Sequence, residues 1–295
     1  MTTFALTCCS TADRPRSFFE SRDIAYACFH WSEGGEDHLD DLYTSITPER
    51  FFGMIKAGAM PTTSQVSIGE YLALWEPALS AGTDVLHVSL SSGLSGAYAA
   101  ACVAATQAQA AHPGRRVLVV DSLGASSGYG LLVECLADMR DAGATVDEAY
   151  GWALEHRLDV HHWFFSTDLS SYVRGGRVSR VSGFVGTALS ICPVLNMNDE
   201  GKLIPRDKIR TKHKAMLDVV SRMEQHALGG TSYDGKCSIS MSACREDAEA
   251  VRELVESRFP KLRGSVAIND IGTVIGSHTG PGTVALFFMG DRRGR

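Results

Sequence analysis

Short apolar runs alternate with longer stretches of helical periodicity in the first half of the chain. An apolar run of about four to eight residues is typical of a buried strand, and apolar residues at i, i+3 and i+4 are typical of an amphipathic helix. Their alternation is typical of a mostly parallel sheet with helices on both faces, so we predict a three-layer α/β/α arrangement. The predicted strands are residues 4–9, 24–31, 84–90 and 117–121.

Capping residues mark where helices begin between these strands. Ser67 and Glu70 have the spacing of a capping box, and Thr145 and Glu148 repeat that spacing further along the chain. Gly82 follows the first of these two helices, at a place where glycine commonly ends a helix. Each pair therefore predicts a helix that starts just after its serine or threonine.

The pattern of predicted elements changes in the second half of the chain. Its first strand-like run is followed by a segment rich in glycine and serine at residues 170–190. Further on, Asn198-Asp199-Glu200-Gly201 separates two strand-like runs and predicts a β-hairpin turn. A basic helix is predicted after the hairpin, at residues 211–228. The other predicted elements are strands at 161–167, 191–197, 202–209, 236–242, 265–270 and 283–289, and a helix at 245–258.

This change in the pattern of predicted elements near residue 160 predicts a domain boundary. Residues 1–160 are expected to form an α/β domain with a mostly parallel sheet, and residues 161–295 an α+β domain with a mixed sheet. The chain has 295 residues, of which 44% are hydrophobic. That length and composition suffice for two ordinary domains with a large buried core.

Charge and composition exclude several classes of protein. A net charge of -6, with 21% charged residues of both signs, is typical neither of a disordered chain nor of a nucleic-acid-binding protein with a basic face. No run of about 18 apolar residues occurs, which argues against a membrane-spanning helix. Residues 1–6 also lack the basic segment of a secretory signal, so we expect a cytoplasmic protein.

The histidines and cysteines give no strong metal signal. The eight cysteines include no C-x-x-C pair. His156, His161 and His162 lie close to Asp159 in the sequence, but they straddle a predicted helix end, where a capping or surface role is expected. We therefore predict no metal and no cofactor.

The most informative local sequence is Ser91-Ser92-Gly93-Leu94-Ser95-Gly96. It lies between an apolar strand and an alanine-rich helix, where unpaired backbone N–H groups and hydroxyls together suit a small anion. Because only two glycines are present and no Gly-Lys follows them, it is neither a dinucleotide fingerprint nor a Walker loop. The alternative is an ordinary helix cap that uses Ser92 or Ser95.

A second hydroxyl-rich turn, Pro61-Thr62-Thr63-Ser64-Gln65, precedes the helix that follows Ser67. Taken alone, it is more typical of an N-cap cluster than of a binding site. The two turns follow one another in an alternating α/β pattern. Both are therefore expected at the carboxyl edge of one parallel sheet, where ligands commonly bind.

A serine hydrolase is the alternative function. Gly124-Ala125-Ser126-Ser127-Gly128 matches G-x-S-x-G between a strand and a helix, and Asp168 and His278 follow in the chain order of a catalytic triad. No His-Gly-Gly oxyanion segment precedes the serine, and the pattern arises easily in a chain rich in serine and glycine. His278 lies in a predicted turn at residues 277–283, where it could contact a carboxylate or satisfy backbone carbonyls.

One basic stretch stands out in this acidic protein. It includes Arg206, Lys208 and Arg210 and continues into the helix predicted at residue 211. The ordinary interpretation is a solvated strand and helix start. The alternative is a surface that docks an acidic partner or transiently contacts an anionic membrane, because local charge steers association even in a protein of negative net charge.

Taken together, these segments resemble the DegV family of fatty-acid-binding proteins over nearly the whole chain. The order and spacing of the motifs carry the resemblance, since each motif alone is weak. The matching segments are Thr63-Ser64-Gln65, Ser91-Ser92-Gly93-Leu94-Ser95-Gly96, Asp121-Ser122, Gly175-Gly176-Arg177, Lys208-Ile209-Arg210-Thr211 with Lys214-Ala215, and His278-Thr279-Gly280-Pro281-Gly282.

The resemblance implies two α/β domains that bury a long-chain fatty acid between them, with no catalysis by the protein itself. It implies that a separate ATP-dependent fatty acid kinase receives the carboxyl group and makes an acyl phosphate for phospholipid synthesis. The basic stretch is then the expected docking site of the kinase. The residues on which the resemblance places the carboxylate contacts are Thr63, Ser92 or Ser95 with Gly93 and Gly96, Arg177, His278 and Thr279.

The chain departs from the family pattern after its first strand. Where the family has Thr-Asp-Ser-Thr, this chain has Cys8-Cys9-Ser10-Thr11, so no role of that aspartate is expected here. Val66 and Ala97 replace a common proline and threonine, and neither change removes a predicted ligand donor.

A third interpretation of the chain is a lipid or small-molecule sensor whose basic stretch docks a regulatory partner.

Overall fold

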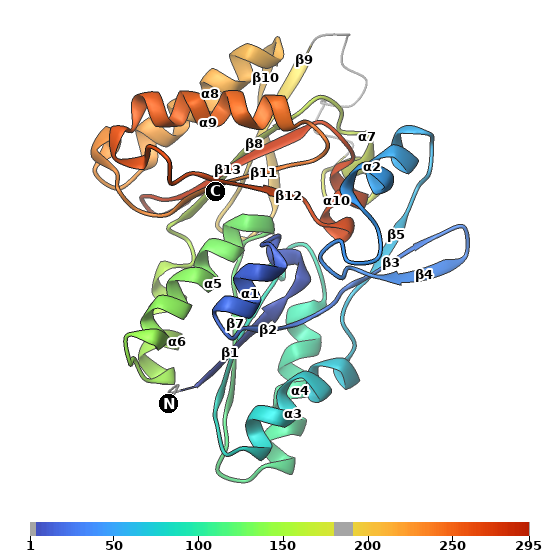
Figure 1. Ribbon diagram of the computed structural model, residues 1–295, viewed down its shortest axis with the longest axis vertical. Coiled ribbons are helices and arrows are strands. Elements are labelled where there is room, and N and C mark those ends of the chain that lie inside the picture. The colour runs from blue at the N-terminus through green and yellow to red at the C-terminus, as the bar shows by residue number, and fades with distance from the viewer. Residues whose placement is uncertain (1–3, 180–190, 295) are drawn as a thin grey trace.

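A sheet of four parallel strands forms the centre of the first half of the protein (Figure 1). The structure is a computed structural model that describes residues 4–179 and 191–294. The strands lie in the order β2-β1-β6-β7, which confirms the predicted parallel arrangement. Their bounds are β1 (Ala5–Cys9), β2 (Ala25–Ala27), β6 (Val85–Ser89) and β7 (Val117–Asp121).

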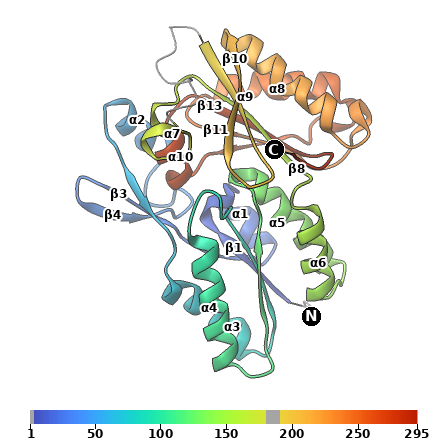
Figure 2. The same ribbon diagram turned by 180° about the vertical axis from the view of Figure 1, so that it is seen from behind.

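Helices cover both faces of this sheet, as predicted (Figures 1 and 2). Helices α3 and α4 pack on each other and on one face, and α5 and α6 pack on the other. The capping boxes at Ser67 and Thr145 form at the starts of α3 and α6. The bounds of these helices are α1 (Arg16–Ser21), α3 (Ile68–Ser80), α4 (Ala97–Ala111), α5 (Ser126–Asp141) and α6 (Val146–His156).

A six-stranded sheet forms the second half, in the order β10-β9-β8-β13-β11-β12. Only the β11–β12 pair is parallel, so the sheet is mixed, as predicted. Helices α8 and α9 cover the face turned away from the first half (Figure 1). The bounds are β8 (Val160–Ser166), β9 (Ile191–Met197), β10 (Leu203–Arg210), β11 (Cys237–Met241), β12 (Ala267–Asp270), β13 (Thr283–Met289), α8 (Lys212–His226) and α9 (Arg245–Arg258).

Helix α5 lies between the two sheets. It contacts β1 on one side and β8, β11 and β13 on the other. Its first turn is glycine-rich because the neighbouring side chains come too close for a larger residue: a Cβ on Gly128 would lie 2.3 Å from His162 Nε2 and 2.6 Å from Phe287 Cδ1. The two halves therefore share this helix and one hydrophobic core, which includes Leu136 and Phe287.

The strands of the parallel sheet all precede residue 160, and those of the mixed sheet all begin at or after it. The division of the chain into two domains at that point stays a prediction. Among the described residues, no helix combines the length and apolarity needed to cross a membrane.

The sequence prediction was wrong at residues 24–31, which form two strands rather than one. After β2 the chain leaves the parallel sheet, and β3 (His30–Glu33), β4 (Glu36–Leu39) and β5 (Thr62–Ser64) form a separate antiparallel sheet. The reversal between β3 and β4 depends on Gly34 and Gly35, which both have positive φ. Figures 1 and 2 show this arm projecting from the body of the protein.

Three short helices pack together beside the arm. They are α2 (Pro48–Lys56), α7 (Ser170–Arg174) and α10 (Thr273–Thr279), and α10 contacts both of the others as well as β3 and β5. The close packing of α10 on α2 depends on Gly276, where a Cβ would lie 2.9 Å from both Phe51 and Phe52. The predicted turn around His278 is therefore a helix, held between elements far apart in the sequence.

Arg293 fastens the C-terminal segment to both halves. Its side chain is 5% exposed and donates to backbone carbonyls of Leu123, Arg157, Leu158, Met197 and Asn198. Burial lowers the pKa of Arg293 to about 10. The guanidinium stays charged at neutral pH, so these carbonyls accept charge-assisted hydrogen bonds.

Candidate functional site

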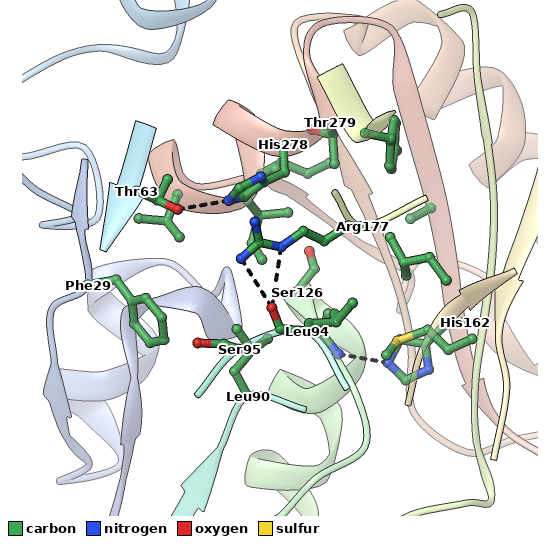
Figure 3. Close-up of a pocket in the computed structure, with 18 of the residues that line it drawn as sticks. Phe29, Thr63, Leu90, Leu94, Ser95, Ser126, His162, Arg177, His278 and Thr279 are labelled. Carbon is green, nitrogen blue, oxygen red and sulfur yellow. Dashed lines mark hydrogen bonds between the residues drawn. The ribbon is translucent and has the colours of Figure 1, made fainter. Parts of the chain in front are cut away.

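A cavity of about 430 Å³ lies where the arm, helix α10, the turn after β6 and the mixed sheet meet (Figure 3). This volume lies in the range of small-molecule sites. Figure 3 shows Thr63 and Phe29 on one side of the cavity and His162 on the opposite side. The apolar residues that line it are Phe29, Leu90, Leu94, Ala125, Phe164, Tyr172, Met197, Leu203, Ile271, Val274, Ile275, Ala285 and Phe287.

Polar side chains gather at one end of the cavity. Thr63 from β5 and His278 from α10 are joined by a hydrogen bond of 2.8 Å between Oγ1 and Nε2, although they are 215 residues apart in sequence. Ser95 and Arg177 also line the cavity, and Figure 3 shows Arg177 beside His278. Six of the eight predicted carboxylate-binding residues line the cavity, and they are Thr63, Ser95, Gly96, Arg177, His278 and Thr279.

His278 is a neutral side chain near pH 7. Burial, together with the charges of Arg177 and Arg174, lowers its pKa to about 4. Its Nδ1 atom is buried and has no hydrogen-bond partner among residues 4–179 and 191–294. Gly175 leaves the space for this ring, because a Cβ there would lie 2.3 Å from Nδ1. The ring is thus held by close packing and by its bond to Thr63.

Arg177 joins the two halves at the polar end of the cavity. Its Nε and Nη2 atoms both donate to the backbone oxygen of Leu94, at 3.3 and 3.2 Å, and Nη1 donates to Gly175 O. Burial lowers the pKa of Arg177. The guanidinium has five N–H groups, so donors remain for a ligand.

The turn at residues 91–96 differs from the prediction, because most of its N–H groups are not free. Ser92 N donates to Asp121 Oδ1, Gly93 N to Ser91 Oγ, and Leu94 N and Ser95 N to Ser91 O. The turn folds back on itself and on β7 and leaves few donors for a ligand.

Ser92 and Gly93 do not line the cavity, and ligand binding by these two residues stays a prediction. Ser92 is exposed, and Gly93 packs against the β9–β10 turn. Ser95 is the serine of this turn that lines the cavity. Its Oγ accepts the Ala97 N–H at 3.2 Å, so its own hydroxyl proton is available to an acceptor in the cavity.

Thr63 reaches the cavity by a route that the sequence did not indicate. It lies on β5 of the antiparallel arm, not in a turn at the edge of the parallel sheet. The expectation that both turns open on one carboxyl edge was therefore wrong. The arm folds back over the turn after β6: a Cβ on Gly96 would lie 2.6 Å from Gln65 Oε1. Gln65 also lines the cavity.

Polar groups in the rest of the cavity wall are bonded to one another. Tyr172 Oη and Thr283 Oγ1 lie 2.9 Å apart, and Thr283 Oγ1 donates to Ser166 Oγ at 3.1 Å. His162 accepts the Ala125 N–H at Nε2 and bonds Val160 O through Nδ1, and burial lowers its pKa well below the usual value. These engaged groups present mainly carbon to the cavity.

Two buried carboxyl groups anchor the start of α10. Asp13 accepts from Gly272 N at 3.0 Å and from Ser126 Oγ, and Asp40 accepts from the N–H and hydroxyl of Thr273 at 3.1 and 2.8 Å. Burial raises the pKa of Asp40, and it raises that of Asp13 well above its usual value. The described residues place no cation in a salt bridge with either carboxyl.

Asp40→Asn is expected to change the pH dependence of stability. A carboxyl with a raised native pKa binds its proton more tightly in the native than in the unfolded state. Its contribution to stability is therefore greatest below the ordinary aspartate pKa of about 3.9 and falls as pH rises through the native pKa. Asparagine removes this loss while keeping an acceptor for Thr273.

The measurement is urea denaturation of both proteins between about pH 4 and pH 7. As pH rises, the free energy of unfolding of the variant should increase relative to that of the wild type. Buried histidines contribute equally to both proteins and cancel in this difference. An unchanged difference across the pH range would contradict a raised pKa at Asp40.

The predicted catalytic triad is not assembled. Ser126 Oγ bonds Asp13 and lies 3.0 Å from Ser240 Oγ, whereas His278 bonds Thr63. Asp168 bonds Ser170 beside α7. Ser126 does adopt the positive φ of a nucleophile elbow and lines the cavity, but within the described part of the chain its hydroxyl bonds Asp13 and Ser240 and no histidine.

A cluster of three potential metal ligands, His161, His226 and Asp291, lies outside the cavity. Both rings bond Asp291 Oδ1, at 3.1 and 3.0 Å. Trp163 Nε1–H donates to His161 Nδ1 at 3.3 Å, so the neutral ring carries its proton on Nε2, which faces Asp291. This tautomer suits hydrogen bonding rather than metal ligation. The expected surface position of His161 and His162 was wrong, since both are buried.

The basic stretch lies on β10, the edge strand of the mixed sheet. Lys208 and Arg210 are exposed, and Arg206 Nε donates to Asn196 Oδ1 at 2.8 Å. A register shift after Pro205 and these charged side chains are features that keep an edge strand from pairing with other strands. Partner docking at Arg206, Lys208 and Arg210 stays a prediction.

The chain resembles known proteins over its whole length. The model of the DegV family, described as an uncharacterised protein of that family, matches residues 3–291. A DegV domain-containing protein of Clostridium perfringens is 33% identical over 284 residues, which are 96% of each chain.

Solved structures agree with this. A DegV family protein of Thermus thermophilus, described as binding fatty acid, is 27% identical with a TM-score of 0.86 and covers 98% of this chain and 100% of its own. A Thermotoga maritima protein, described as revealing fatty acid binding function, is 26% identical with a TM-score of 0.80, with the same coverage.

Proposed function

This chain belongs to the DegV family, and we propose that it binds a long-chain fatty acid in the cavity between its two halves. The observation that carries the proposal is the cavity itself. One end has hydroxyls, an arginine and a neutral histidine, and the rest of the wall is largely apolar. A cavity with one polar end and an otherwise apolar wall suits a molecule with one acidic group and a long apolar tail.

The polar end suits a carboxylate without a metal. Neutral His278 can donate from Nε2 to Thr63, which leaves the Thr63 hydroxyl free to donate to a carboxylate oxygen. Ser95 and the remaining N–H groups of Arg177 supply further donors on the same side. A hydrogen bond from an arginine to a carboxylate is charge-assisted and therefore stronger than one between neutral groups.

The apolar wall supplies most of the affinity. Burying about 14 methylenes at roughly 0.8 kcal/mol each gives on the order of 11 kcal/mol before ordering costs. The carboxylate contacts add about 1 kcal/mol each and fix the orientation of the acid. The acid therefore binds mainly through its tail, with its carboxylate at Thr63 and His278.

Mass spectrometry of lipids extracted from the purified protein tests the proposal. A long-chain fatty acid is expected at close to one molecule per chain, or after incubation with palmitate if the protein is purified empty. Protein denatured before incubation with palmitate serves as the control for adventitious lipid. A folded protein that yields no acid and takes up none would overturn the proposal.

The finer part of the proposal concerns what happens to the bound acid. We propose that a separate ATP-dependent kinase docks on β10 through Arg206, Lys208 and Arg210 and phosphorylates the carboxylate, so that the carrier itself does no chemistry. The support is the exposure of two of these basic residues on an edge strand. Exposed charges of one sign increase the association rate with a partner of the opposite sign.

Reversing the charge of the basic strand is expected to slow acyl phosphate formation with little effect on fatty acid affinity. The variant is Lys208→Glu with Arg210→Glu, and the effect should shrink as salt rises because screening weakens steering. Lys261→Glu with Arg263→Glu, two exposed residues before β12 at the opposite edge of the sheet, is the matched control because it also reverses two charges. The measurement is acyl phosphate formed with a fatty acid kinase and ATP; equal rates for both variants would exclude docking on β10.

A further inference from the structure

The geometry points to Ser91 and the β9–β10 turn as the device that positions the carboxylate-binding donors of Ser95 and Gly96. This inference rests on the proposed function, since it concerns how the bound carboxylate is oriented. Neither Ser91 nor the turn residues 198–201 line the cavity. They act on the site through the backbone of residues 91–96.

Ser91 holds the turn in shape from inside. Its side chain is fully buried, and its hydroxyl oxygen accepts the Gly93 N–H at 3.1 Å. Its carbonyl accepts the N–H groups of Leu94 and Ser95 at 3.0 and 3.2 Å. The direction in which Ser95 presents its hydroxyl to the cavity is therefore set by Ser91.

The same hydroxyl connects the turn to the second half of the protein. Ser91 Oγ donates to Gly201 O in the β9–β10 turn at 2.8 Å. The two backbones are in direct contact, because a Cβ on Gly93 would lie 2.6 Å from Glu200 O and one on Gly201 would lie 2.1 Å from Ser91 Oγ. Such a close approach requires glycine on both sides.

The β9–β10 turn is rigid enough to act as a support. Asn198 Oδ1 accepts the N–H groups of Glu200 and Lys202 at 3.2 and 2.9 Å, which fixes the turn internally. Arg293 donates to Asn198 O, and Asp199 N donates to Gly294 O, which fixes it to the C-terminal segment. A side chain that hydrogen-bonds its own turn in this way preorganises the backbone.

The turn at residues 91–96 is thus held from two sides by the second half. Arg177 binds Leu94 O on the cavity side, and Gly201 binds Ser91 on the far side. If the far contact is lost, the turn pivots about Leu94 and the Ser95 hydroxyl changes direction. The carboxylate then loses good hydrogen-bond geometry although every ligand residue is still present.

The test is NMR of palmitate labelled with carbon-13 at its carboxyl carbon or at its terminal methyl, bound to the full-length protein. Ser91→Ala removes both hydroxyl contacts, and Ser92→Ala is the matched control because Ser92 is exposed and off the cavity. The carboxyl resonance is expected to move in Ser91→Ala only, the methyl resonance to stay, and affinity to fall about five- to tenfold.

A second pair of variants acts from outside the cavity and keeps the inference falsifiable if Ser91→Ala does not fold. Asn198→Ala removes the acceptor that fixes the β9–β10 turn, and Asn198→Asp keeps it. The carboxyl resonance should move in Asn198→Ala and return towards wild type in Asn198→Asp. A folded Ser91→Ala or Asn198→Ala protein with the wild-type carboxyl resonance overturns the inference. A wild-type protein that binds no palmitate overturns the proposed function instead.

Discussion

Ala285→Phe is expected to lose most of its affinity for palmitate while it still binds an acid of about ten carbons. Thr283, Ala285 and Phe287 alternate along β13 and all line the cavity, so the new ring fills space that the tail needs. A tail that loses about four buried methylenes loses about 3 kcal/mol, which is roughly a 200-fold increase in Kd.

The measurement is the Kd of each acid by calorimetry or by displacement of a fluorescent fatty acid. Ala267→Phe is the matched control, because Ala267 is exposed on β12 and the same ring is added outside the cavity. The control should bind both acids as the wild type does. Palmitate affinity at the wild-type level in Ala285→Phe would mean that the tail does not run along β13.

Gly128→Ala is expected to destabilise the protein by about 3 kcal/mol or more. The added methyl would lie 2.3 Å from His162 Nε2 and 2.6 Å from Phe287 Cδ1, and both side chains are 2% exposed. Moving the ring also breaks its bond with the Ala125 N–H. The loss should appear as a lower urea midpoint with an unchanged slope.

Gly151→Ala is the matched control for this substitution. Gly151 lies in α6, it is exposed, and a Cβ there would meet no atom within 4 Å. Alanine in an open helical position should raise the free energy of unfolding by roughly 0.5–1 kcal/mol. If both variants shift stability in the same direction, the close approach of α5 to β8 is not the reason for glycine at position 128.

The sequence predicted the elements whose signals are local. The capping boxes at Ser67 and Thr145 and the hairpin turn at Asn198 depend on residues within a few positions of one another, and each was found where expected. The parallel sheet was predictable for a related reason, because strands buried on both faces tend to be continuously apolar, as the first four residues of β7 are.

The parts that could not be predicted depend on long-range contacts. Nothing near Thr63 in the sequence shows that β5 leaves the main sheet and brings it against His278. The segment around His278 was predicted as a turn, whereas it forms α10, whose packing on Phe51 and Phe52 needs Gly276. The choice of Ser95 over Ser92 likewise depends on how Ser91 bends the turn.

Helix α5 limits how the chain can be cut into parts that fold separately. A cut at residue 160 would leave this helix with its face towards β8, β11 and β13 exposed, and would leave the inner face of the mixed sheet without cover. Neither fragment could bury its apolar surface alone. We therefore expect heat or urea to melt both halves in one cooperative transition.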